Sequence, residues 1–385
     1  MAKKDPDIII IGGGVAGLSA SIGSIRGGLK NVILLEKNNE FGLRIKGEVI
    51  NKDAEIFKKI FKTKGGLPEN VINIVFKTAK YYTPSMKKSA LRKFPNNIKV
   101  GIEYRKLIDE LLSVAIKEEV DIRINSRVLE LIKQNNKIIG VKFQEFGVIK
   151  ELYPKIIICA VGLHSNLSIP SIKAPKNVCL ANKFNVRNIN LSDQFQLDFF
   201  LLDIPGVIYI FPKSKTEAEL GIMIWTDQIH AIDNINPNNI LHNNIEKNPI
   251  LKDRLINAKI IYYSKEKLAM GGSNKEIFTP NTFFIGDLMG HVGAVGGSGI
   301  ISCLNIGYDL GLTVSKLLLE KDELTNQDFL DCQRMINKSE IGKWLKKEQS
   351  NAKLMREILY KDFKNIDHID SLWDKFKYLV ESRGA

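Results

Sequence analysis

Two hydrophobic patterns divide the chain. Short runs that are apolar at nearly every position, at 8–11, 32–35 and 155–160, have the length and β-branched content of strands buried on both faces. From about 170 to 276, apolar segments such as 206–212 are interrupted by polar positions instead, a texture that predicts an antiparallel sheet with one covered face. We therefore expect an α/β protein in which a parallel-sheet domain is combined with a second, antiparallel sheet.

Three segments show helical spacing. Residues 100–119 predict an amphipathic helix with Arg105 in its first turns, and 237 to about 256 a polar helix. Residues 320–385 are helical and highly charged, and two interpretations stay open: a helical cap folded onto the body, or a basic amphipathic face lying on a membrane. Residues 51–99 are basic and irregular, with short strands and turns that the pattern does not place.

Glycines follow the first apolar run in the spacing G-x-G-x-x-G. Gly12, Gly14 and Gly17 suit a tight turn, close approach to a pyrophosphate and helix–strand contact, and Glu36 ends the second strand 19 residues after the third glycine. The acid suits a free ribose hydroxyl, so the motif predicts FAD or NAD rather than NADP; the alternative is a glycine-rich turn in an unrelated βαβ unit. The cofactor contacts predicted in the first part of the chain are Gly12, Gly14, Val15, Ala16, Gly17, Glu36, Lys37 and Val128.

A second glycine-rich loop lies near residue 290. A strand ends in Gly286–Asp287, and five glycines between 290 and 299 then open a helix of small residues. Asp287 can bind a ribityl hydroxyl, while the amides of Gly299 and Ile300 can bind the flavin pyrimidine, where the helix dipole favours the anionic reduced ring. This loop reaches the flavin end of the same ligand, so the pair of motifs predicts FAD.

Other cofactor contacts rest on position alone. Lys46 and Gly47 follow the second strand, where a segment can run along the flavin or form a plain surface loop. Arg105 could meet a phosphate or a ribityl oxygen, or be an ordinary exposed arginine. Gly162 follows a buried strand, which suggests that the chain approaches the dinucleotide a second time at this glycine. The many Phe, Ile, Met and Tyr residues of the antiparallel region suit an apolar ligand and core packing equally well.

Composition narrows the function classes. At 385 residues the chain can bury a large core and hold two domains, and its 44% hydrophobic and 26% charged residues are typical of a soluble globular protein. It shows neither a cleavable signal nor an apolar run of about 18 residues. Four scattered cysteines fit a reducing cytosol and predict no metal site. The net charge of +13 permits anionic lipid or acidic protein partners; without a nucleic-acid motif, no nucleic acid is expected, and a merely solvated surface explains the charge as well.

Taken together, the motifs support a family resemblance. They are Gly12–Gly17 with Glu36, Lys46–Glu48, Arg105, Ala160–Ser165, Tyr209–Pro212 with Gly221, and Gly286–Asp287 with Gly299–Ile300. The chain resembles flavoproteins of the hydroxybenzoate-hydroxylase-type fold and is most similar to the geranylgeranyl reductase family. The resemblance implies bound FAD and hydride transfer from the reduced flavin to a C=C bond of an isoprenoid lipid chain. It also implies substrate contacts at Tyr209, Phe211 and Pro212.

The sequence departs from the family at two places. Lys46–Gly47–Glu48 stands where members have Cys-Gly-Glu, which leaves open a non-catalytic flavin-binding or lipid-binding homologue. Val161–Gly162 replaces the Asp-Gly of related hydroxylases, which weakens the other alternative, a flavin monooxygenase or halogenase. Candidate proton sources for alkene reduction are water, Lys46, Tyr209 and His291.

The expected organisation follows from these assignments. A discontinuous FAD-binding domain takes 1–50, 100–168 and 277–318, a substrate domain takes 51–99 and 169–276, and a helical segment takes 319–385. The resemblance and the basic charge together suggest an acidic electron donor such as a ferredoxin. The expected location is the cytoplasm, with peripheral contact at the inner face of the cell membrane as a further possibility.

Overall fold

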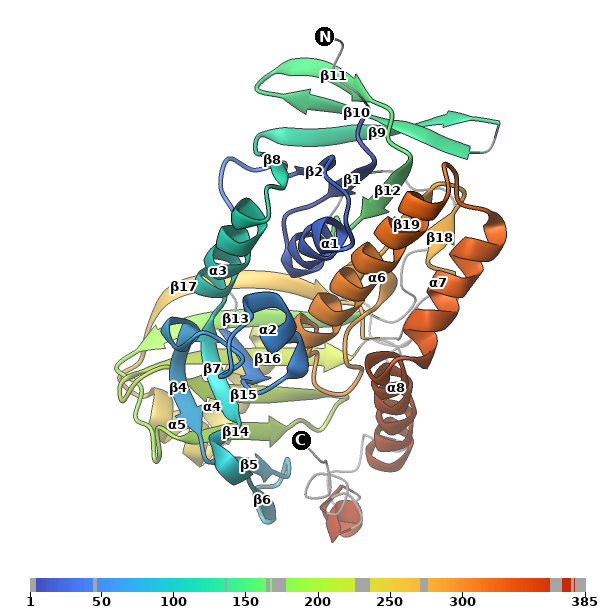
Figure 1. Ribbon diagram of the computed structural model, residues 1–385. Helices are drawn as coiled ribbons and strands as arrows, with labels where there is room; N and C mark the ends of the chain where they lie inside the picture. The colour runs from blue at the N-terminus through green and yellow to red at the C-terminus, as the bar shows by residue number, and fades with distance from the viewer. Residues whose placement is uncertain are drawn as a thin grey trace.

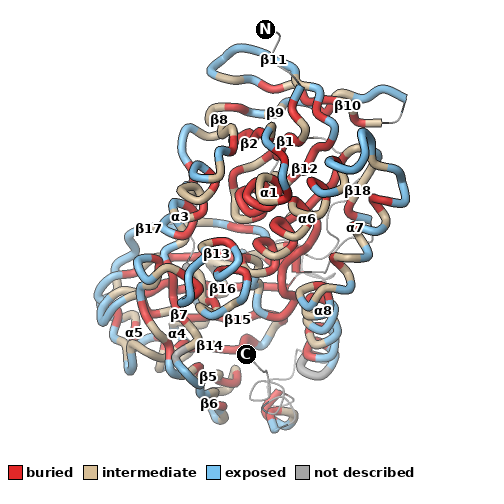
Figure 2. The backbone as a smooth tube through the Cα atoms, in the orientation of Figure 1, coloured by how far each residue is buried: buried red, intermediate tan, exposed pale blue. Residues whose placement is uncertain are grey.

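Two large sheets, joined by helices that cross between them, carry the fold (Figure 1). The computed structural model describes residues 5–43, 47–135, 137–163, 167, 178–225, 236–270, 276–360, 369–374 and 377. Buried backbone concentrates along the first sheet and the two helices that cross it, as Figure 2 shows. Lys46, one of the predicted cofactor contacts, lies outside the described residues.

The first sheet has six strands in the order β18-β19-β12-β1-β2-β8, parallel except for β18. The strands are β1 Ile8–Ile11, β2 Val32–Leu35, β8 Asp121–Arg123, β12 Ile156–Cys159, β18 Phe278–Thr279 and β19 Thr282–Phe284. Every residue of β1, β2 and β12 is buried, as their uninterrupted apolar runs predict. Beside this sheet lies an antiparallel one of β9 Ser126–Gln134, β10 Lys137–Glu145 and β11 Val148–Leu152.

Helices α1 (Val15–Arg26) and α6 (Ile300–Glu320) pack against each other with almost no space between their backbones. A Cβ atom added at Gly23 would lie 2.2 Å from the carbonyl oxygen of Tyr308, and one at Gly307 would lie 2.4 Å from that of Ala16. These contacts explain the small residues that follow the first glycine motif. They also fix the N-termini of both helices at the same cavity.

Helix α3 (Tyr104–Lys117) buries Leu107, Leu111 and Ala115. The helix predicted over 100–119 is therefore wrong at its start, because residues 99–103 form strand β7 (Lys99–Glu103). β7 is the central strand of a small antiparallel sheet, in the order β3-β7-β4. The apolar residues of β7 run directly into the apolar positions of α3, and no glycine or proline separates the strand from the helix.

The second large sheet has seven strands in the order β17-β13-β16-β15-β14-β5-β6. They are β5 Thr78–Tyr82, β6 Ser89–Lys93, β13 Cys179–Arg187, β14 Gln196–Leu201, β15 Gly206–Pro212, β16 Glu217–Trp225 and β17 Lys259–Leu268. Helices α4 (Pro237–Lys247) and α5 (Pro249–Leu255) cover one face, where Arg254 of α5 pairs with buried Asp198 of β14. The opposite face is turned toward the first sheet and lines a cavity.

Residues 51–99 supply pieces to both small and large sheets. β3 (Gly47–Asn51) precedes α2 (Glu55–Phe61), the 3-10 turn η1 (Glu69–Val71) leads into β4 (Ile72–Phe76), and a second turn, η2 (Pro95–Asn97), follows β6. β5 and β6 form a hairpin, but β5 also pairs in parallel with β14, which lies more than 100 residues further along the chain.

The C-terminal helices pack against the body. α7 (Asn326–Lys338) begins with a capping box formed by Thr325 and Asp328, and α8 (Glu340–Leu359) follows it. Buried side chains fix both helices and the described part of the final segment: Phe329, Cys332, Ile336, Leu345, Met355, Ile369 and Trp373. In the part of the chain that the structure describes, no helix has the length and apolar content needed to cross a bilayer.

The glycine-rich loop between β19 and α6 (with the turn η3, Gly286–Met289) is anchored by His291, which is fully buried. Its Nδ1 accepts a hydrogen bond from the Gly286 amide at 3.2 Å, and its carbonyl accepts one from the Ser302 hydroxyl at 2.6 Å. Burial lowers the pKa of His291 to about 4. His291 is therefore a neutral residue that holds the loop, and it is not among the cavity-lining residues.

We expect Gly23→Ala to destabilise the protein by about 1–3 kcal/mol, although alanine favours helices, because the new methyl group meets the α6 backbone. Urea unfolding measures the difference. Gly65→Ala is the matched control: Gly65 is exposed, has no atom within 4 Å of an added Cβ, and should change stability by no more than about 0.5 kcal/mol. Equal stability of the two variants would contradict the tight helix contact.

His291 predicts a pH dependence of stability. Its folded-state pKa lies below the ordinary value of 6.5, so as the pH falls the unfolded chain binds the proton first, and stability is lost. We expect the titration of His291 to lower the free energy of unfolding by about 3 kcal/mol as the pH falls from about 6.5 to about 4. The comparison is His291→Asn, which keeps an acceptor near Nδ1; if its stability falls as steeply over this range, His291 is not the titrating group.

Candidate functional site

One cavity of about 940 Å³ is lined by residues from both large sheets. Its wall takes in the turn after β1, the ends of β2, β12 and β19, the start of α6 and the inner face of the seven-stranded sheet. Predicted contacts from distant parts of the sequence therefore share one wall. They are Gly12, Gly14, Val15, Ala16, Glu36, Lys37, Val128, Gly162, Tyr209, Phe211, Asp287, Gly299 and Ile300.

At one end, the β1–α1 turn is held in shape by the acid that ends β2. The Glu36 carboxylate accepts hydrogen bonds from the Gly13 amide at 2.8 Å and the Asn38 amide at 2.9 Å. Gly12 has a φ of +105°, which favours glycine, and a Cβ at Gly17 would lie 1.9 Å from the Gly12 oxygen. Gly17 thus permits helix–strand contact and is not among the lining residues.

Gly14 differs from its neighbours. It caps the N-terminus of α1 in an ordinary extended conformation, and a Cβ added there would meet no protein atom within 4 Å. This glycine is not needed for the fold, yet it faces the cavity beside the first amides of the helix. That arrangement fits a dinucleotide pyrophosphate lying against the helix N-terminus.

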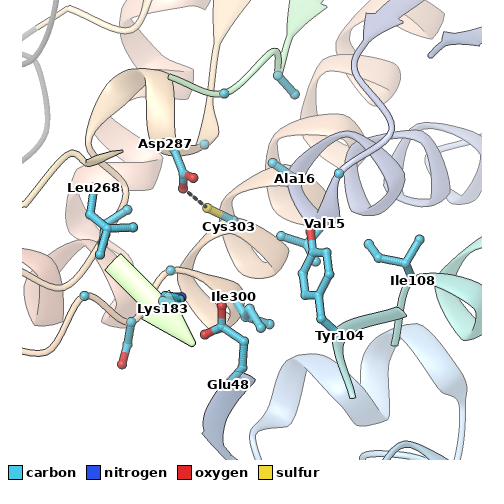
Figure 3. Close-up of a pocket in the computed structure, with 18 of the residues that line it drawn as sticks. Val15, Ala16, Glu48, Tyr104, Ile108, Lys183, Leu268, Asp287, Ile300 and Cys303 are labelled. Atoms are coloured by element: carbon cyan, nitrogen blue, oxygen red, sulfur yellow. Dashed lines mark hydrogen bonds between the residues drawn. The ribbon is translucent and has the colours of Figure 1, made fainter. Parts of the chain in front are cut away.

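The N-terminus of α6 approaches the same cavity from another side (Figure 3). Gly299 caps the helix and Ile300 begins it, so helical geometry gives their amides no partner within the first turn. Asp287 lies next to them, with its Oδ1 3.9 Å from the Cys303 Sγ. Amides, helix dipole and carboxylate together match the polar edge of a flavin and its ribityl chain. The cavity thus fits FAD along its length.

Two predicted contacts lie away from this wall. Arg105 is half-exposed and is not itself among the lining residues; it forms an ion pair at 2.7 Å with Glu40, which does line the cavity, and this contact raises the pKa of Arg105. Pro212 ends β15 and is likewise not among the lining residues. Gly47 begins β3, and the next residue, Glu48, lines the cavity.

Tyr209 lies flat on the inner face of the large sheet. Its ring covers the neighbouring strand, where a Cβ at Gly221 would be 2.0 Å from the Tyr209 Cζ. The hydroxyl donates to the Glu219 carboxylate at 2.9 Å. Burial, followed by the charge of Glu219, raises the pKa of Tyr209 well above 10, so the phenol stays protonated. The Phe211 ring lies 4.3 Å from it.

Lys183 is a lining residue that the sequence prediction missed. Its side chain projects from β13 toward Glu48 and Ile300 (Figure 3), and its ammonium lies 3.9 Å from the Glu266 carboxylate. β13 pairs Lys183 with Gly221, which in turn pairs with Tyr209, so the three residues form one row across the sheet. The sequence carried no signal for Lys183 beyond its place in the alternating region, because its inward position is set by the pairing of β13 with β16.

Comparison with known proteins agrees with this geometry. The family model described as FAD dependent oxidoreductase matches residues 7–162. The digeranylgeranylglycerophospholipid reductase of Methanococcus vannielii is 27% identical, over 93% of this chain and 86% of its own length. That of Thermoplasma volcanium is 26% identical, over 92% of this chain and 90% of its own length.

Solved structures confirm the predicted fold class. A geranylgeranyl bacteriochlorophyll reductase-like protein from Thermoplasma acidophilum superposes with a TM-score of 0.81 at 24% identity, covering 96% of this chain and 90% of the other. A flavin-dependent brominase superposes with a TM-score of 0.74 at 17% identity, covering 98% and 94%. This chain is an FAD-dependent oxidoreductase and a distant homologue of the digeranylgeranylglycerophospholipid reductases.

Proposed function

We propose that the protein reduces C=C double bonds in the isoprenoid chain of a lipid. The relatives named above carry this activity in their names. The observation that supports it most directly is the continuity of the cavity, which leads from the N-termini of α1 and α6 to an apolar and aromatic wall on the large sheet. A long apolar substrate could lie along that wall with one bond at the flavin.

In this proposal, each group of lining residues binds a different part of FAD. Gly12, Gly14 and the first amides of α1 hold the pyrophosphate, Glu36 the adenosine ribose, and Asp287 the ribityl chain, while Gly299 and Ile300 hold the pyrimidine edge. FAD, when bound and reduced, supplies the hydride. The N-terminus of α6 favours the negative charge that reduction places on the ring, because its dipole is positive at that end.

The large sheet would position the substrate and exclude water. An unactivated alkene develops no oxyanion for the protein to stabilise, so catalysis depends on a dry, close-fitting site. The apolar residues of the wall that suit such a site are Leu201, Val207, Met223, Trp225, Leu268 and Met355. Five of these six residues are fixed by strands of the same sheet, which makes the wall rigid.

A proton must also reach the second carbon. Tyr209 faces the cavity, but its raised pKa and its donation to Glu219 make it a weak acid there. Lys183 brings an ammonium group, which carries protons that it can donate, to the same wall. We therefore assign the proton to Lys183, directly or through water.

Gly14→Ala tests the cofactor site. We expect the free energy of unfolding of the cofactor-free protein to fall by no more than about 1 kcal/mol, because the methyl group meets no protein atom and only the N-cap preference for glycine is lost. The FAD dissociation constant should rise about tenfold or more, because the methyl group occupies pyrophosphate space. Urea unfolding and flavin fluorescence titration give the two quantities. Unchanged FAD affinity would place the pyrophosphate elsewhere.

Anaerobic turnover tests the reaction. We expect the dithionite-reduced protein to be reoxidised by a geranylgeranyl lipid, with products heavier by two mass units for each reduced bond, and Lys183→Met to slow this reoxidation while still binding FAD. Absorbance at the oxidised flavin band and mass spectrometry follow it. Rapid oxygen consumption driven by NAD(P)H, without alkene reduction, would instead favour a monooxygenase or halogenase of the same fold. If Lys183→Met leaves the rate of flavin reoxidation unchanged, Lys183 is not the proton donor.

A further inference from the structure

The glycine-rich loop at 293–299 forms the part of the cavity wall that comes directly before α6, and residues 295–298 line the cavity. Two hydrogen bonds close the loop on itself. The Gly293 amide donates to the Ser298 carbonyl at 2.8 Å, and the Gly297 amide donates to the Gly293 carbonyl at 2.9 Å. Because glycines let the peptide groups of such a loop rotate, a single loop shape needs support from another element.

Helix α8 holds one peptide group of this loop at both ends. The group joins Ala294 to Val295. Its amide donates to Oε2 of Glu348 at 3.2 Å, and its carbonyl accepts from Nη2 of Arg356 at 3.4 Å. The N–H therefore meets a carboxylate and the C=O meets a guanidinium, and hydrogen bonds to charged groups are stronger than those between neutral groups. Rotation of this peptide plane would break both contacts.

The two charged residues are themselves fixed. They lie eight residues apart on α8, a spacing that places them on one side of the helix. Arg356 is buried, and its guanidinium carbon lies 5.8 Å from the centroid of the Trp225 ring. One turn before Glu348, the Trp344 ring touches the loop backbone, because a Cβ added at Gly293 would lie 2.7 Å from Cη2 of that ring. This face of α8 is thus a rigid support for the loop.

We propose that Glu348 and Arg356 are positioning residues for the flavin: by fixing the loop peptide they fix the amides of Gly299 and Ile300 that follow it. The proposal rests on the placement of the pyrimidine edge at these amides, as in the proposed function, but not on any substrate. Reduction places negative charge on the ring, and amides already held in place stabilise that charge better than amides that must first be ordered. α8 therefore controls how readily the bound flavin accepts electrons.

Redox titration of the FAD-loaded protein tests this role. We expect Glu348→Ala to weaken the binding of reduced FAD about tenfold more than that of oxidised FAD, which lowers the two-electron midpoint potential by about 30 mV. Glu348→Gln keeps an acceptor for the Val295 amide and should leave the ratio of the two affinities within about twofold of wild type. Arg356→Met keeps most of the side-chain length but has no donor, and should act like Glu348→Ala. Absorbance of oxidised flavin, read with mediator dyes, gives the potential.

The sign of the change separates positioning from the effect of charge alone. If the carboxylate acted only through its charge, its removal would favour the anionic reduced ring, and Glu348→Ala and Glu348→Gln would both raise the potential. That result would overturn the proposal. Glu357→Ala is the matched control: Glu357 is exposed on α8, pairs with Lys353 at 3.7 Å and is not a lining residue, so the affinity ratio should stay within about twofold.

Hydrogen exchange measures the loop itself, without the flavin. In the cofactor-free protein, the amides of 293–299 should exchange about tenfold faster in Glu348→Ala, and within about threefold of wild type in Glu348→Gln. Unchanged exchange in Glu348→Ala would overturn the proposal, as would faster exchange with an unchanged potential.

Two features keep the outcome unambiguous. If Glu348→Ala does not fold, Glu348→Gln and Arg356→Met still decide, because charge alone predicts opposite changes of potential and positioning predicts a change only in Arg356→Met. No lipid enters either measurement. A protein that fails to reduce alkenes would therefore contradict the proposed function and leave the role of α8 standing.

Discussion

The close contact of α1 with α6 is the constraint on which the site depends. Each helix begins at a glycine-rich turn, and each N-terminus is useful to an anionic ligand only if it is aimed at the same space. Gly23 and Gly307 let the two backbones meet, and any side chain there would collide with a carbonyl oxygen. The helix crossing, rather than either loop alone, turns two local motifs from distant parts of the chain into two ends of one cavity.

Local signals allowed both glycine-rich turns that line the cavity to be located in the sequence. Gly12 is required by its positive φ, and Gly17 by the nearby Gly12 oxygen. Both requirements arise within a few residues of the chain, so the spacing of these glycines can be recognised without knowledge of the fold. The pairing of Arg105 with Glu40 was not predicted, because which carboxylate a surface arginine meets depends on tertiary arrangement. The start of α3 was misplaced because β7 runs into it without a turn residue between them.

The face of the large sheet that lines the cavity was harder to predict, because its strands are paired across long distances. β5 lies beside β14, where Thr78 and Gln196 are 118 residues apart, and no pattern within 51–99 reveals that partner. Lys183 was missed for the same reason. Its place on the cavity wall follows from the register that sets it in one row with Gly221 and Tyr209. Without that register, a lysine in a half-covered strand is expected to be solvated.

The two faces of the large sheet show why charge on the inner face is informative. On the face covered by α4 and α5, the buried charge of Asp198 is matched by Arg254, within an apolar cluster. Burial raises the pKa of Asp198, which shows how unfavourable an ionised group is in that layer. On the cavity face, the Lys183 ammonium lies 3.9 Å from the buried Glu266 carboxylate, and the Tyr209 hydroxyl donates to buried Glu219, so these polar groups also have protein partners. Burying charged groups is costly even when they are paired, so a face that served packing alone would be more stable with apolar side chains at these positions.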